Sequence, residues 1–270
     1  MKDTTIALAV QNSCCGMFQD NLAKCIKYTE MASDRGASVI LFPEMNLTGY
    51  TSGANLTSIA AELSFDLKSA LQNISKKKSI AILAGMAHKE DDNQIYASHF
   101  AIMPDNSFFI YKKIHLAPPE QETLTRGNEI EISCLKSTHL NFGIQLCYDA
   151  HFPQLSAAMA VKGADLIMIP HASPRGTSKE KYESWMRHLT ARAFDNGVFI
   201  AACNQTGENG NGLSFPGVAV VIGPDGKVIS KYTDNKEGLL ITKLKASYID
   251  DIRDHKMKYF LPNRRDDIYS

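Results

Sequence analysis

The sequence predicts an α/β protein with a mixed β-sheet that is covered on both faces. Continuous apolar runs, typical of buried strands, alternate along the chain with segments of helical period. Turn signals at 104–106 and 223–226 add antiparallel hairpins, which makes the sheet mixed. The pattern Gly-Ala-x-aliphatic-Ile-x-x-Pro occurs at both 36–43 and 163–170, so we expect two similarly built halves.

The first half is expected to begin with a strand and then alternate helices with strands. The helix at 20–35 carries Leu22, Ile26 and Met31 on one face and ends at Gly36, a residue that often stops helices. The expected strands lie at 6–10, 39–42, 80–87, 96–103 and 107–111, and a second helix is expected at 58–76.

The second half repeats this alternation. Its first helix, at 153–161, begins with Pro153, a residue favoured in the first turn of a helix. The other expected elements are strands at 140–146, within 163–170, and at 198–202, 218–222 and 228–232, a helix at 179–195, and a polar C-terminal tail from about 248. Because no linker rich in Gly, Pro or Ser interrupts the chain, we expect residues 1–270 to form a single domain.

Composition narrows the classes of function. The 270-residue chain is 44% hydrophobic, and its 29 Lys and Arg balance 29 Asp and Glu, which gives no electrostatic reason to expect nucleic acid or an anionic membrane as partner. No apolar run approaches the roughly 20 residues of a membrane helix, and the N-terminal run predicts a strand, not a signal peptide. Six cysteines without regular spacing predict neither disulfides nor a zinc site, and a reducing cytoplasm is the expected location.

Three reactive side chains each follow a β-rich apolar run. Glu44 follows the run at 39–43, Lys113 follows the run at 108–112, and Cys147 follows the run at 142–146. Residues at the carboxyl ends of strands converge in α/β folds, so these three are expected to meet. An acid, a base and a thiol can together support acyl transfer, in which the thiol carries the acyl group as a thioester.

Each of these residues also has an ordinary structural explanation. Cysteine is often a small core residue, Glu44 would serve as a solvated strand cap, and paired lysines are usually exposed. A Cys–His dyad with His115 is a minority alternative. The context of Cys147 favours catalysis, because a strand, a turn and a helix start would place it beside free backbone N–H groups that lower a thiol pKa and bind an oxyanion.

The three stretches resemble the signature of the nitrilase superfamily, the carbon–nitrogen hydrolases. The matching segments are Phe42-Pro43-Glu44 with Thr48-Gly49-Tyr50, then Tyr111-Lys112-Lys113-Ile114-His115-Leu116, and Gly143-Ile144-Gln145-Leu146-Cys147-Tyr148-Asp149 with Phe152-Pro153. The resemblance extends over most of the chain and departs from the common pattern at Gln154, where Glu is usual, and at His151, where Arg is frequent.

The resemblance implies a four-layer α-β-β-α sandwich and a Glu44–Lys113–Cys147 triad. A second glutamate assists the site in many members of the family, and here Glu120 fits best, with Glu122 as the fallback. The implied chemistry needs no metal or organic cofactor. Family members are usually homo-oligomers, and the helix that contains Trp185 is a candidate dimer face.

The resemblance favours an amide or an N-carbamoyl compound as the small-molecule substrate. Tyr50 is expected in the acyl pocket, the N–H of Tyr148 in the oxyanion site, and the segment from His171 to Arg175 at the rim. Arg175 would bind a substrate carboxylate, although a solvated or interface arginine is the ordinary explanation. Nitrile hydrolysis, amide transfer to an acceptor other than water, and a catalytically idle binding or scaffold protein remain as alternatives.

Overall fold

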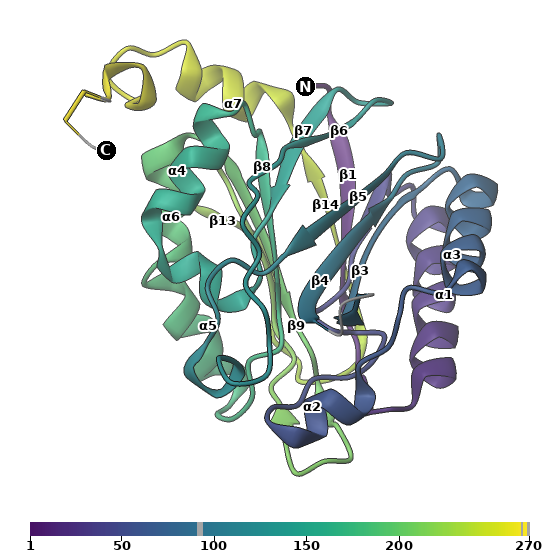
Figure 1. Ribbon diagram of the computed structural model, residues 1–270. Coiled ribbons are helices and arrows are strands. Elements are labelled where there is room, and N and C mark those ends of the chain that lie inside the picture. The colour runs from purple at the N-terminus through teal and green to yellow at the C-terminus, as the bar shows by residue number, and fades with distance from the viewer. Residues whose placement is uncertain (91–93, 266, 269–270) are drawn as a thin grey trace.

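The structure of the protein, a computed structural model, describes residues 1–90, 94–265 and 267–268. It is a four-layer α-β-β-α sandwich, in which two sheets pack face to face and helices cover the outer face of each (Figure 1). This arrangement confirms the fold class that the sequence predicted. Within the described residues, every helix is too short or too polar to cross a lipid bilayer.

The first sheet has six strands in the order β14-β1-β2-β3-β4-β5. Helices α1 (Phe18–Asp34) and α3 (Phe65–Lys78) cover its outer face, on the right in Figure 1. The strands are β1 (Thr4–Val10), β2 (Val39–Leu41), β3 (Ala81–Lys89), β4 (Ile95–Ile102), β5 (Phe108–Lys112) and β14 (Gly238–Leu244).

The second sheet has six strands in the order β13-β12-β9-β8-β7-β6. Helices α4 (Pro153–Val161), α5 (Ser178–Met186) and α6 (Leu189–Asn196) lie on its outer side, on the left in Figure 1. Its strands are β6 (Ser133–Leu135), β7 (Leu140–Ile144), β8 (Leu166–His171), β9 (Phe199–Asn204), β12 (Ala219–Ile222) and β13 (Val228–Tyr232). The smaller elements are α2 (Ala54–Ile59), α7 (Ala246–Arg253), β10 (Gly207–Glu208), β11 (Ser214–Phe215) and the 3₁₀ turns η1 (Pro118–Glu120), η2 (Cys147–His151) and η3 (Leu261–Asn263).

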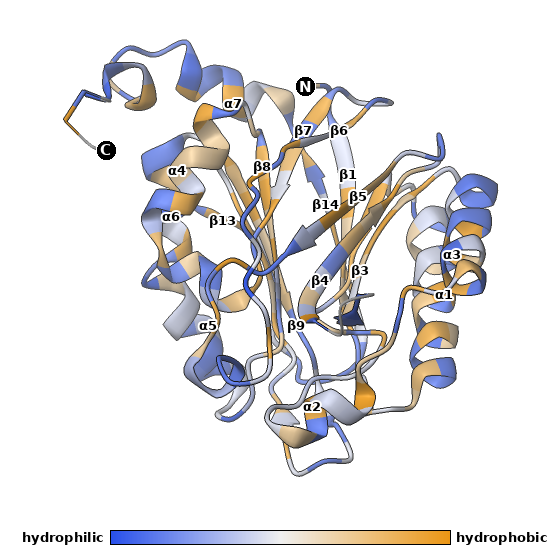
Figure 2. Ribbon diagram, viewed as in Figure 1, coloured by the Kyte–Doolittle hydropathy of each residue, from blue (hydrophilic) through white to orange (hydrophobic). Residues whose placement is uncertain are grey.

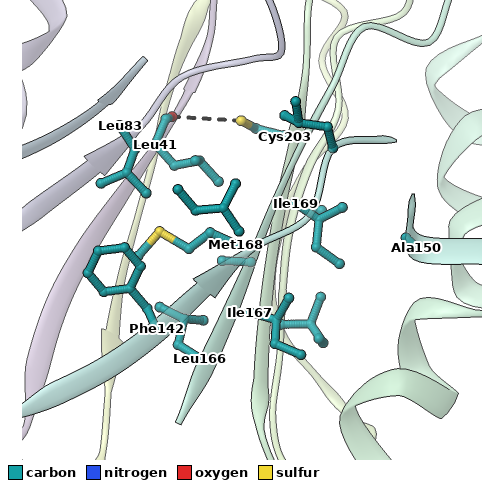
Figure 3. Packing of buried hydrophobic residues seen from close by; sticks show 14 of the residues in the cluster. Leu41, Leu83, Phe142, Ala150, Leu166, Ile167, Met168, Ile169 and Cys203 are labelled. Carbon is teal, nitrogen blue, oxygen red and sulfur yellow. Dashed lines mark hydrogen bonds between the residues drawn. The ribbon is translucent and has the colours of Figure 1, made fainter. Parts of the chain in front are cut away.

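Alternating side chains on the central strands build two apolar layers. Ile6 and Leu8 face the second sheet, whereas Ala7 and Ala9 face α1 and α3, which explains why these strands read as continuous apolar runs (Figure 2). Between the sheets, Leu41 and Leu83 lie close to Phe142 and Met168, and the Cys203 thiol donates to Leu41 O across the interface at 3.7 Å (Figure 3).

The structure differs from the predicted elements in several places. The helix expected at 58–76 is divided into α2 and α3, because Ala61 donates its N–H to Ala87 O and the Ser64 side chain caps α3. The helix expected at 179–195 is divided into α5 and α6 at Arg187–His188, where i→i+3 hydrogen bonds replace helical ones. The strand β14 was not predicted, since most of its residues are only partly buried.

The segment expected to form a polar tail from about residue 248 begins inside α7. Ile249 and Ile252 are buried, and Arg253 bonds Asp165 Oδ1 at 2.7 Å and Ala164 O at 2.9 Å. These contacts fix α7 to the segment that leads into β8.

Candidate active site

The site lies at the carboxyl ends of β2, β5 and β7, where the two sheets face each other. The carboxylate of Glu44, three residues beyond the end of β2, is 1% exposed. Its Oε1 lies 2.8 Å from Lys113 Nζ, and its Oε2 accepts the backbone N–H of Ala172 at 3.1 Å. Gln205 Nε2 donates to the Glu44 carbonyl at 2.8 Å, which fixes the backbone as well.

Lys113 directly follows β5 and is fully buried. Its Nζ lies 2.8 Å from both Glu44 Oε1 and Glu120 Oε1. The chain then loops out and returns at Gly127, which donates its N–H to Lys113 O at 2.7 Å. A side chain at Gly127 would clash with the carbonyl of Lys112, so this close approach requires glycine.

Glu120, the last residue of η1, completes the buried charge cluster. Its Oε1 accepts from Tyr50 Oη at 3.0 Å in addition to Lys113, and its Oε2 accepts the N–H of Ala117 at 2.8 Å. Glu122 is exposed. The structure therefore brings Glu120, and not the fallback Glu122, to Lys113.

Cys147 begins η2 with a φ of 43°, an unusual conformation for a residue other than glycine. Non-glycine residues hold such backbone angles only where their surroundings enforce them, and these positions concentrate at functional sites. The thiol interacts electrostatically with Glu44, Lys113 and Glu120, and the N–H of Ala172 favours its thiolate. The segments that carry the acid, the lysine and the thiol thus meet as predicted.

Asp149, which the sequence analysis did not single out, connects the cysteine turn to the lysine segment. Its Oδ2 accepts from Tyr111 Oη at 2.8 Å and from the N–H of Leu146 at 3.0 Å, and its Oδ1 accepts the N–H of His115 at 2.7 Å. Tyr111 and His115 stand on either side of Lys113. The Asp149 carboxylate therefore fixes the backbone before Cys147 relative to the segment that carries Lys113.

Two buried carboxylates share the single ammonium of Lys113. Burial raises the pKa of Glu44 to about 7, and the Glu120 charge adds to this effect while Lys113 opposes it. Burial alone would lower the pKa of Lys113, but Glu44 and Glu120 together raise it well above its ordinary value. The two carboxylates therefore favour the charged form of Lys113, and Glu44 is a carboxylate that can exchange a proton near neutral pH.

The expectation that Cys147 has a lowered pKa is wrong. Burial and the Glu44 carboxylate raise the pKa of the thiol to about 12, and Lys113 and the Ala172 N–H only partly oppose them. The thiol is therefore protonated at neutral pH. It needs a base to become a nucleophile, and Glu44 is the neighbouring carboxylate with a pKa suited to that task.

The other expected site residues differ in their surroundings. The Tyr50 hydroxyl reaches Glu120, and Tyr148 is half-buried within η2. His171 is buried at the end of β8 and stacks on Trp185 at 4.3 Å between ring centroids, whereas Arg175 is exposed. Because Trp185 is buried inside the chain, it is not itself available to a partner on the candidate dimer face.

No group of three or more His, Cys, Asp and Glu side chains suited to a metal ion occurs among the residues described. The chemical resources of the site are a buried lysine between two glutamates, a thiol on a constrained turn and backbone N–H groups. Together with the four-layer α-β-β-α sandwich, they define a class of protein in which a buried Glu, Lys and Cys are arranged for thiol-based acyl transfer.

Comparison with known proteins narrows this class. A family model described as carbon-nitrogen hydrolase matches residues 5–254, and the chain belongs to this family. It is 30% identical to a probable nitrilase of Schizosaccharomyces pombe over 92% of this chain and 91% of the relative. It is 29% identical to a 2-oxoglutaramate amidase of Bacillus subtilis over 88% of this chain and 90% of the relative.

A crystal structure of an amidase from Nesterenkonia sp. has the same fold. It superposes with a TM-score of 0.84 at 26% identity, over 98% of this chain and 95% of the amidase. That amidase has also been solved as a mutant in complex with butyramide, and as another mutant with the acetamide moiety of fluoroacetamide added covalently at its active site cysteine.

Proposed function

We propose that the protein hydrolyses a carbon–nitrogen bond of a small amide or N-carbamoyl compound through a thioester on Cys147. The observation that carries this proposal is the buried Glu44–Lys113–Glu120 cluster, whose charges act on the Cys147 thiol. Burying three ionisable groups is unfavourable for folding unless they are paired, so such clusters are often functional.

In the acylation step Glu44 acts as general base. It accepts the proton of Cys147 as the sulfur attacks the carbonyl carbon, so that no free thiolate has to form in advance. Lysine has three N–H donors, and Glu44 and Glu120 occupy two of those on Lys113. The third donor and the Tyr148 N–H would stabilise the oxyanion, and each such donor contributes about 10²–10³-fold to the rate.

The tetrahedral intermediate then collapses to a thioester. Glu44 returns its proton to the departing nitrogen as the C–N bond breaks, and ammonia or an amine leaves. A water molecule gives a proton to Glu44 as its oxygen attacks the thioester carbon. When the C–S bond breaks, Glu44 returns this proton to the Cys147 sulfur, which releases the carboxylic acid and restores the thiol. Glu120 holds Lys113 in place throughout, through the 2.8 Å contact.

Amide hydrolysis is the most strongly supported of the alternatives. Relatives include proteins named omega-amidase and 2-oxoglutaramate amidase, and the Nesterenkonia amidase has been captured with butyramide. N-carbamoyl compounds present the same carbonyl to a thiol. Transfer to an acceptor other than water would use the same thioester, and nitrile hydrolysis would reach it through a thioimidate on the same cysteine. Both stay as second candidates.

Product analysis tests the proposal. The purified protein is incubated with butyramide, an N-carbamoyl amino acid and butyronitrile, and ammonia and the organic product are measured together. We expect carboxylic acid and ammonia in equal amounts from butyramide. Turnover of butyronitrile alone would show that the protein is a nitrilase and not an amidase. Absence of turnover with all three compounds would contradict the proposed hydrolysis.

A further inference from the structure

Lys181 is a partly buried cation beside the candidate site that has no acidic partner. It lies on α5, and its Nζ donates to Ser173 Oγ at 2.7 Å and to Pro174 O at 3.2 Å. Both acceptors are neutral and belong to the loop that follows His171. No carboxylate lies within ion-pair distance of Lys181 in the part of the chain that the structure describes. One of its three donors is therefore left for another group.

The placement of Lys181 contrasts with that of a neighbour on the same helix. The side chain of Lys179 is 84% exposed and lies 3.9 Å from Glu183, an ordinary surface pair. Burial lowers the pKa of Lys181, and a thiolate at Cys147 would oppose this shift, so Lys181 lies within electrostatic range of the proposed nucleophile. An ammonium held near a thiol without a counter-ion is costly unless a ligand supplies the anion.

His171 provides a second, independent sign of a missing ligand. It is 2% exposed, and neither of its ring nitrogens has a hydrogen-bond partner among the described residues. Its ring is held against Trp185, and it interacts electrostatically with both Lys181 and Lys113. Buried polar atoms are rarely unpartnered in folded proteins, so a polar group is expected to bind beside the His171 ring.

We propose that Lys181 and His171 form a subsite for a substrate carboxylate, so that the substrate is an amide carrying a free acid at its far end. This inference rests on the proposed function, because the amide must sit at Cys147 for the acid to reach Lys181. It also transfers the carboxylate-binding role from Arg175, which is exposed and held in a left-handed conformation with its N–H bonded to Ser214 O at 2.9 Å.

The test compares two substrates that differ only in the charged group. In succinamate a carboxylate replaces the terminal methyl of butyramide. The kcat/KM ratio of succinamate to butyramide is measured for the wild type, Lys181→Met, Lys179→Met and Arg175→Met. A charge-assisted hydrogen bond corresponds to a factor of about 10–100, so Lys181→Met should lower the ratio by about that factor, mainly through KM for succinamate. Lys179→Met, the matched exposed control, and Arg175→Met should leave the ratio unchanged.

Several outcomes would overturn the subsite. One is a wild-type enzyme with the same kcat/KM for butyramide and succinamate. This result would rule out the subsite but not the proposed amide hydrolysis. Another is an equal loss of kcat/KM for both substrates in Lys181→Met, which would show that the role of Lys181 is structural. A ratio that falls only in Arg175→Met would return the role to Arg175. If the wild type releases ammonia from neither amide, the proposed function fails together with the subsite.

Discussion

The two halves of the sandwich are built alike but carry different groups at equivalent positions. Read from β5 to β14, the first sheet pairs its strands antiparallel, antiparallel, parallel, parallel and antiparallel, and the second sheet repeats this order from β13 to β6. The repeated Gly-Ala pattern leads into β2 in one half and into β8 in the other. The repeat in the sequence is therefore a repeat in the structure.

The strand registers show which residues correspond. Leu8 pairs with Leu41 in the first half, and Ile144 pairs with Met168 in the second. Cys147 lies three residues beyond Ile144, as Gln11 lies three residues beyond Leu8. Gln11 is buried and donates to Asn21 O and Asn46 O at 3.3 and 3.4 Å. One position thus holds a thiol in one half and a structural amide in the other.

The residues that follow the repeated pattern differ in the same way. Glu44 follows Pro43, and its counterpart His171 follows Pro170. Burial raises the pKa of Glu44, whereas burial and nearby cations lower the pKa of His171 well below its ordinary value. The N–H of Ala172, next to His171, bonds Glu44. The comparison teaches that a duplicated scaffold supplies position, and that the chemistry depends on the side chain placed there.

The largest difference in activity loss is expected between substitutions of Glu44 and of its counterpart His171. Glu44→Gln keeps the shape of the side chain but removes the proposed general base, and kcat/KM for amide hydrolysis should fall by about 10³-fold. His171→Phe keeps a ring against Trp185. With succinamate it should cost about tenfold, mostly in KM, because it removes only a contact of the proposed carboxylate subsite. Steady-state ammonia release measures both variants. Equal losses would break the comparison.

A smaller loss is expected for Asp149, which has no role in proton transfer. Asp149→Asn replaces one carboxylate oxygen with an NH₂ group, which cannot accept the N–H of Leu146 or of His115. The turn that carries Cys147 should therefore shift relative to Lys113. Misplacement of this kind lowers kcat/KM by about 10–100-fold. The matched control is Asp225→Asn in the exposed β12–β13 turn, which should leave activity unchanged. Full activity in Asp149→Asn would show that the buried carboxylate does not position the site.

The pH dependence of kcat/KM tests the difference between Glu44, which follows β2, and His171, which ends β8. Glu44 must be ionised to accept the thiol proton, and its pKa is raised to about 7. The ionised fraction therefore decreases as the pH falls through that value, and kcat/KM should fall about tenfold for each pH unit below it. The residual activity of Glu44→Gln should lack this acid limb. A wild-type profile that is flat down to the ordinary pKa of glutamate would contradict a base with a raised pKa.

The smallest effect on activity is expected at Gln11. Gln11→Ala leaves the carbonyls of Asn21 and Asn46 without this donor, so the free energy of unfolding should fall by about 1–3 kcal/mol. Activity should change by less than about tenfold, since the hydrogen bonds that the structure gives for Gln11 go to Ser13, Asn21 and Asn46 and not to the charge cluster. Urea unfolding and ammonia release measure the two quantities. A large loss of activity with unchanged stability would place Gln11 in the site.

Much of the site could be predicted because strand ends are visible in the sequence. Apolar runs located β2, β5 and β7. The residues that follow these strands meet because β2 and β5 end side by side in the first sheet and β7 ends opposite them in the second sheet. The choice between Glu120 and Glu122 needed the structure. It depends on the η1 turn, which brings Glu120 to Lys113 and leaves Glu122 exposed.

Contacts between distant segments left no signal in the sequence. Asp149 bonds Tyr111 and His115 from more than 30 residues away, and the Ala172 N–H reaches Glu44 across the two halves. Periodicity also missed the division of both long helices, since the contacts that end them involve backbone groups and not apolar spacing. The raised pKa of Cys147 was missed for a similar reason. Burial by the rest of the fold raises this pKa by more than the backbone N–H groups near the turn lower it.

The claim that Cys147 carries the acyl group is tested most directly by trapping the adduct. p-Nitrophenyl butyrate has a leaving group that needs no protonation, so acylation should outrun hydrolysis and give a burst of nitrophenolate. We expect one butyryl group per chain on the peptide that contains Cys147, protection by excess butyramide, and neither adduct nor turnover in Cys147→Ala. Butyramide hydrolysis that persists in Cys147→Ala, or a butyryl group found only on another cysteine, would contradict the thioester mechanism.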